Sequence, residues 1–93
     1  MSTNKVNEDM IKNLYGLILS LKDEQDCRDL FSDMCTNKEI EQMAQRIRAA
    51  ELLLEGKTYS EVIEETDISS ATLSRVSRCV QYGNGYKRLL RSK

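Results

Sequence analysis

The apolar residues of this chain recur at intervals of three and four, and no proline interrupts them. Such spacing puts side chains on one face of an α-helix, whereas a half-buried strand needs strict alternation. Two stripes of this kind precede residue 35: Met10, Leu14, Leu17, Ile18 and Leu21, then Cys27, Leu30, Phe31 and Met34. We find no strand pattern, and therefore expect an all-α fold.

Start and stop signals divide the remaining sequence into further helices. Thr36 with Glu39, and Thr58 with Glu61, fit the capping-box pattern that opens a helix. Gly56 fits a helix end. The central helix is expected to have apolar contacts on more than one side, because Leu52 and Leu53 fall off its main stripe. That stripe consists of Ile40, Met43, Ala44, Ile47, Ala50 and Leu54.

Within a single all-helical domain of residues 1–93, we predict four segments. N-terminal dimerisation helices occupy residues 5–35 and a long central helix occupies residues 36–57. A helix-turn-helix follows at residues 59–78, with Asp67-Ile68-Ser69 as its turn. Gly83 and Gly85 then open a basic C-terminal segment at residues 83–93, of which residues 86–91 could form a last helical turn or two.

Composition narrows the classes of protein that fit. The three cysteines, Cys27, Cys35 and Cys79, have no metal-finger spacing, and the chain has no histidine. We therefore predict reduced thiols, no metal site and no cofactor. Without histidine or a Gly-rich phosphate loop, we do not expect an enzyme. No apolar run approaches a membrane span and the first residues do not resemble a signal peptide, so we expect a cytoplasmic protein.

The charges are distributed unevenly along the chain. Six bases and no acid lie between Ser70 and Lys93, whereas acids outnumber bases before residue 46. Such an imbalance favours contact between one face and a polyanion. A basic C-terminus that is merely solvated is the alternative.

Residues 59–78, YSEVIEETDISSATLSRVSR, fit a helix-turn-helix. Two short helices that cross steeply need apolar residues at fixed places to lock together. These residues are predicted to be Val62, Ile63, Ile68, Leu73 and Val76. Two positions depart from the usual pattern: Asp67 replaces a turn glycine, and Ile63 replaces a small residue.

The outer face of this segment has the chemistry of a double-stranded DNA contact. Small residues allow close approach, hydroxyls bond bases or phosphates, and arginine forks onto guanine or phosphate. The predicted DNA-binding residues are Tyr59, Ser60, Ser69, Ser70, Ala71, Thr72, Ser74, Arg75 and Arg78. Those in the first turns of the second helix are expected to meet bases, Arg78 a phosphate, and Arg75 either. A helical protein-interaction module without DNA binding is the alternative.

The segment TNKEIEQMAQRIRAAELLLEGKTYSEV, followed by ISSATLSRVSR, resembles the core of the Trp repressor family. It is most similar to the YerC/YecD branch, as is the closing YGNGY. The resemblance covers about residues 36–86. It implies an intertwined homodimer in which the N-terminal helices of each chain wrap around the other. It also implies a repressor-type transcription factor that reads a near-palindromic operator.

The resemblance further implies an effector pocket. The two arginines that flank the indole of L-tryptophan in the Trp repressor match Arg46 and Arg75, and a contributing threonine matches Thr36. Val76, however, stands where the family has glycine, and Cys79 where it has serine. Valine would crowd an indole and cysteine bonds weakly. We therefore do not expect L-tryptophan at Thr36, Arg46, Arg75 and Cys79; DNA contacts or ion pairs for the arginines, or another small effector, stay open.

Overall fold

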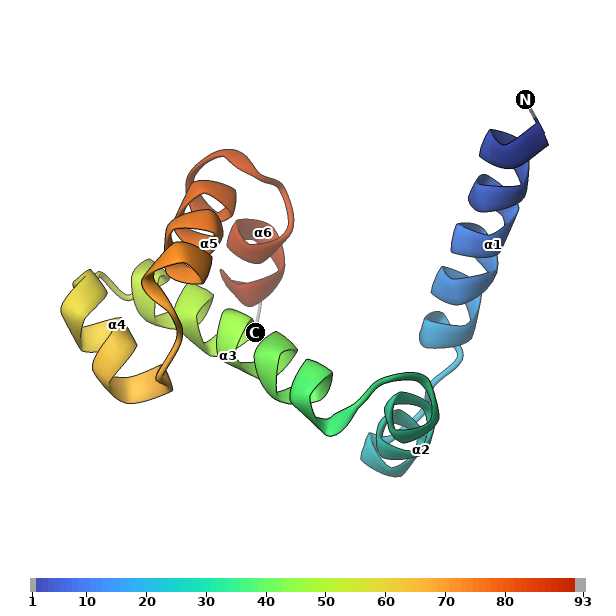
Figure 1. Ribbon diagram of the computed structural model, residues 1–93, viewed down its shortest axis with the longest axis horizontal. Helices are drawn as coiled ribbons and strands as arrows, with labels where there is room; N and C mark the ends of the chain where they lie inside the picture. Colours follow the sequence, from blue (N-terminus) through green and yellow to red (C-terminus); the bar gives the residue numbers. More distant parts are fainter. Residues whose placement is uncertain (1, 92–93) are drawn as a thin grey trace. The chain divides into compact units, whose positions relative to one another are not determined.

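The computed structural model describes the backbone of residues 2–91 and the side chains of residues 7–91. Over this range the secondary structure is helical, with no strand, which confirms the all-α prediction (Figure 1). The helices are α1 (Ser2–Leu19), α2 (Glu24–Met34), α3 (Asn37–Leu54), α4 (Tyr59–Thr66), α5 (Ser70–Tyr82) and α6 (Tyr86–Arg91). Met1 of the predicted domain, and Ser92 and Lys93 of the predicted C-terminal segment, lie outside the described residues.

The chain divides into two compact units, Met1–Met34 and Cys35–Lys93. The division falls one residue before the boundary predicted between the N-terminal helices and the central helix. That both units form one domain stays a prediction.

The first unit, α1 and α2, leaves its apolar residues largely uncovered. Met10 is 61% exposed, Leu17 47% and Leu19 85%. Helix α2 begins where the Asp23 carboxylate accepts from the Asp26 N–H at 2.9 Å, and none of its residues is buried. The apolar stripes predicted here therefore have no complete cover within one chain.

In the second unit, α3 begins at the predicted cap Thr36 and ends at Leu54, three residues before the end of the predicted segment 36–57. The Thr36 hydroxyl accepts from the Glu39 N–H at 3.1 Å, and the Glu39 carboxylate accepts from the Thr36 N–H at 2.8 Å. At the other end Gly56 has a φ of 91°, a left-handed conformation that glycine adopts without steric cost. Thr58 and Glu61 form a second capping box, which starts α4.

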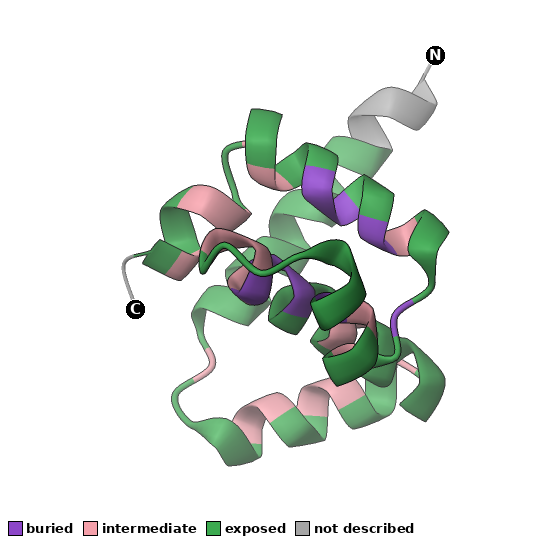
Figure 2. Ribbon diagram, turned by 90° about the vertical axis from the view of Figure 1, so that its left-hand side faces the viewer, coloured by how far each residue is buried: buried purple, intermediate pink, exposed green. Residues whose placement is uncertain are grey.

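The core of the second unit lies where α4, α5 and α6 gather around α3 (Figure 1). Its largest fully buried side chains are Leu52, Val62 and Leu73, one from each of α3, α4 and α5. Figure 2 marks the buried positions in purple. The buried apolar residues are Ala49, Ala50, Leu52, Val62, Ile68, Leu73 and Val76, and Ser77 of α5 is buried as well.

The predicted buried face of α3 is partly wrong. Ile47 is 47% exposed although it was placed on the buried stripe. The expected apolar contacts on a second side are confirmed by Leu52, which is buried. All buried residues of α3 lie in its second half. There it packs against three helices, so the buried sector is wider than one stripe.

Helix α5 ends at a position that glycine alone fits. The carbonyl oxygen of Cys79 accepts a hydrogen bond from the Gly83 N–H. A Cβ on Gly83 would lie only 2.7 Å from that oxygen. The chain can therefore turn there into α6, which packs against α3 and α5. No helix in the described part of the chain is both long and apolar enough to cross a membrane.

Candidate nucleic-acid interface

Helices α4 and α5 form the predicted helix-turn-helix. Val62 of α4 and Leu73 of α5 are fully buried, and Val76 and Ile68 are each 3% exposed. These are four of the five positions predicted to lock the two helices, and Ile63, the fifth, is half-buried against the same core. The pattern of apolar residues therefore correctly predicts which side chains pack between α4 and α5.

The turn between the helices uses a left-handed residue that is not glycine. Asp67 has φ 61° and ψ 21°, and its N–H donates to the carbonyl of Ile63 at 2.8 Å. Aspartate tolerates this conformation better than most residues. The structure thus confirms the prediction that Asp67 can form the turn in place of the usual glycine.

Ser69 caps the N-terminus of α5. Its hydroxyl oxygen accepts from the Thr72 N–H at 3.2 Å, and its O–H donates to the Thr72 hydroxyl at 2.9 Å. The two hydroxyls therefore hold each other in place. Thr72 is half-buried, unlike its neighbours Ser70 and Ala71, so its side chain has less freedom to meet a base edge.

One face of α5 points into solvent. Its exposed residues include Ser70, Ala71, Ser74, Arg75 and Arg78. Tyr59 and Ser60, at the start of α4, are exposed as well. Small, hydroxylated and basic side chains thus share the accessible surface that a DNA contact requires, and their role in that contact stays a prediction.

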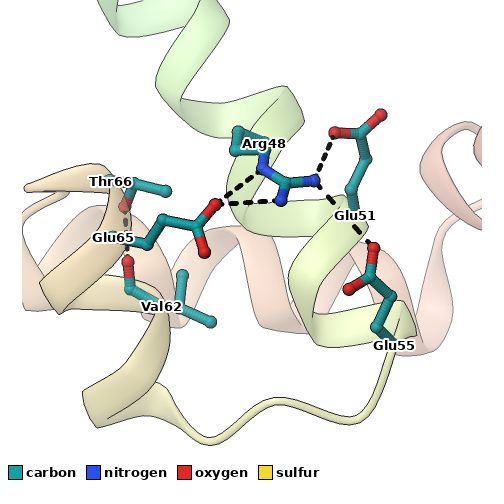
Figure 3. Close-up of polar contacts among 6 residues, drawn as sticks. All are labelled: Arg48, Glu51, Glu55, Val62, Glu65 and Thr66. Atoms are coloured by element: carbon teal, nitrogen blue, oxygen red, sulfur yellow. Dashed lines mark hydrogen bonds and ion pairs between the residues drawn. The ribbon is translucent and has the colours of Figure 1, made fainter.

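Helix α5 has no acid, whereas α3, α4 and the turn residue Asp67 carry the acids nearby. Figure 3 shows Arg48 of α3 between Glu51, Glu55 and Glu65. Hydrogen bonds to Glu51 and Glu65 raise the pKa of the Arg48 guanidinium. The charge of Arg48 is therefore offset by the carboxylates around it. Arg75 and Arg78 make the exposed face of α5 positively charged.

A cavity of about 320 Å³ lies behind α5 and brings together three of the four residues predicted for an effector. Its lining residues are Arg46, Thr72, Arg75, Val76, Cys79 and Tyr86. Thr36, the fourth predicted residue, is not among them and caps α3 instead. An effector at these residues stays a prediction. Tyr86 was not assigned to this pocket, although it ends the YGNGY segment on which the resemblance partly rests.

Two residues that hold the helix-turn-helix were also not identified from the sequence. The Gln45 side-chain amide donates to the Thr66 carbonyl, and the Arg48 guanidinium bonds the Glu65 carboxylate. Both are polar residues of α3 that contact partners 17 to 21 positions away. No local spacing signals such contacts.

Known proteins agree with this arrangement of helices. The family model of the Trp repressor protein matches residues 9–93. The uncharacterized protein YerC of Bacillus subtilis strain 168 is 45% identical over 84 residues, which are 90% of this chain and 81% of that protein.

Two solved structures are similar over nearly the whole chain. A Staphylococcus aureus protein described as a candidate Trp repressor is 34% identical, with a TM-score of 0.89, and the match covers 99% of this chain and 93% of that one. A TrpR-like protein from Eubacterium eligens ATCC 27750 is 42% identical with the same TM-score, covering 96% and 93%. The resemblance noted in the sequence is confirmed: this chain belongs to the Trp repressor protein family.

Proposed function

We propose that this chain is a sequence-specific, double-stranded DNA-binding regulator of transcription that acts as a homodimer and represses. The observation that carries the proposal is the division of α5 into two faces. Leu73 and Val76 are buried against the core, while small residues and the two arginines, Arg75 and Arg78, are exposed. A recognition helix needs this division, because it must be held from behind while its outer face enters the major groove.

The position of each residue along α5 assigns its role. Ser70, Ala71 and Ser74 lie in the first turns, which reach base edges in helix-turn-helix complexes. Arg78 lies about one turn beyond Ser74 and meets a phosphate, which fixes register without reading sequence. Arg75 lies between these regions and can serve either purpose.

A second copy of the chain completes the proposal. The exposed apolar residues of α1, such as Met10 and Leu17, need cover that one chain does not provide. Two copies related by a twofold axis present two recognition helices, so the operator is a near-palindrome with half-sites about one helical turn apart. The membership of a Trp repressor family supports repression as the outcome.

The test begins by selecting bound sequences from a random pool of DNA duplexes. Affinity for the selected site is then titrated at several salt concentrations, for the unchanged protein and for Arg78→Ala. The substitution should weaken binding to selected and unrelated DNA alike. It should also flatten the salt slope by about one unit for each arginine removed, hence about two for a homodimer.

Arg28→Ala is the matched control, because Arg28 is an exposed arginine of α2 that pairs with Glu24. It removes the same charge away from the helix-turn-helix and should leave the salt slope unchanged. A protein-interaction module would instead select no sequence and show no steep loss of DNA affinity with salt. Selected sites without inverted symmetry would contradict the homodimer on DNA.

A further inference from the structure

The turn of the helix-turn-helix is tied to α3 by two polar side chains. The Gln45 Nε2 donates to the carbonyl oxygen of Thr66 at 3.1 Å. One turn later on α3, the Nε and Nη2 of Arg48 both lie 2.9 Å from one carboxylate oxygen of Glu65 (Figure 3). Glu65 and Thr66 are the last two residues of α4, so both contacts act where that helix gives way to the turn.

Thr66 is the last residue of α4, so a hydrogen bond to it acts directly before the turn. Its carbonyl is among the last four of α4, which lack partners within the helix. Its hydroxyl donates to the Val62 carbonyl at 2.7 Å and accepts from the Ile68 N–H at 3.3 Å. Because only Asp67, Ile68 and Ser69 separate α4 from α5, a shift of Thr66 is passed on to the start of the recognition helix.

Side-chain packing holds the turn from one side only. Ile68 is buried in the core, but a cavity of about 270 Å³ lies between the turn and the first half of α3. Lys38, Gln42, Gln45, Asp67 and Ser69 are among the residues that line this cavity. Gln45 lies at the edge of this cavity, and its hydrogen bond to the Thr66 carbonyl adds a polar contact between α3 and the end of α4.

We propose that Gln45 is a positioning residue that sets the angle at which α5 meets DNA, acting through the Thr66 carbonyl. This inference rests on the proposed DNA-binding function. Gln45 carries it rather than Arg48 for two reasons. The Gln45 bond is partly buried, whereas the side chains of Arg48 and Glu65 are 46% and 50% exposed, and solvent weakens exposed ion pairs. Arg48 also divides its bonds among three carboxylates.

The variant Gln45→Met tests the role, since methionine keeps the length and volume of the side chain and removes the donor. Affinity for the selected operator should fall about three- to tenfold per subunit, the range for loss of one net hydrogen bond. Affinity for unrelated DNA and the salt slope should stay unchanged, because the phosphate-binding charges remain. Gln42→Met, an exposed glutamine on the same helix, is the matched control and should bind the operator normally.

A second variant, Gln45→Asn, keeps the amide but is one methylene too short for the same bond, and should show the same selective loss. Equal affinity of both variants and the unchanged protein for the operator would overturn the positioning role. So would an equal loss on operator and unrelated DNA, or loss of the helical fold in both variants by circular dichroism. If the unchanged protein binds no DNA, the proposed function itself fails, which is a different result.

Discussion

At residue 67 the backbone must be left-handed whatever side chain the chain carries. Asp67 holds φ at 61° there, between α4 and α5. For residues other than glycine this region costs roughly 1–2 kcal/mol, and aspartate and asparagine are the best tolerated.

We therefore expect Asp67→Val to lower the free energy of unfolding by about 1–2 kcal/mol, because a β-branched side chain is strained at this φ. Asp67→Asn should stay within about 0.5 kcal/mol of the unchanged protein, since it keeps the same shape. Urea unfolding of the three proteins measures both values. Equal stability of the valine and asparagine variants would show that the turn can relax to a different conformation.

Residues differ in how far the sequence reveals their role. The caps Thr36 and Thr58 and the turn residue Asp67 were predicted, because each acts on backbone within four positions of itself. Gln45 and Arg48 were not, because their partners are brought near by the fold and not by the sequence.

Helix α4 has eight residues and is the shortest of the three helices that contribute fully buried side chains to the core. A helix this short is marginal without caps and tertiary contacts. Its start is fixed by Glu61, whose carboxylate accepts from the Thr58 N–H at 2.9 Å. That hydrogen bond, with the Thr58 hydroxyl, holds the pKa of Glu61 below its usual value of 4.5.

This capping contact predicts a dependence of stability on pH. Because the folded pKa of Glu61 is depressed, its contribution is present above the unfolded pKa and is lost as pH falls through the folded pKa. In Glu61→Gln this part of the acid destabilisation should disappear. The free energy of unfolding should therefore fall less steeply below about pH 4.5 than in the unchanged protein.

Urea titrations at a series of acid pH values measure the effect. Glu64→Gln is the matched control, because Glu64 is an exposed acid of the same helix that takes no part in the capping box. Identical pH profiles for Glu61→Gln and the unchanged protein would contradict the role of the cap.

At the scale of the helices, the sequence predicts their order and length better than which of their faces are buried. Capping signals place the ends of α3, α4 and α5. The prediction for α3 is right at Leu52, which is buried on a second side, and wrong at Ile47, which is exposed. Apolar spacing tells which residues share a face, but the number of neighbouring helices decides how much of the circumference is covered.

At the scale of the whole molecule, the main feature is that apolar side chains of the first unit are exposed. Leu17 is 47% exposed and Met10 61%. Burial of apolar surface contributes roughly 25 cal/mol per Å², so a second copy that covers this surface would stabilise both chains. The apolar stripes in the sequence already predict that this surface requires a partner.

We predict that the protein sediments as a dimer and that Leu17→Asp or Phe31→Asp gives monomers or unfolded chain. A buried carboxylate without a partner would oppose association. Asn13→Asp, which puts a carboxylate at another exposed position of α1, should leave the dimer intact. A stable, folded monomer of the unchanged protein in sedimentation velocity would exclude the dimer.

The short connections between the helices have a consequence for how fast the second unit can form. Three residues join α4 to α5, and another three join α5 to α6. Helical proteins rich in such local contacts fold within microseconds to milliseconds. With no proline in the chain, no step waits tens of seconds for prolyl isomerisation. In the proposed homodimer the concentration-dependent step is the encounter of two copies, which is slower than the folding of a small helical unit. The time needed to assemble that homodimer would therefore depend on how much protein the cell has made.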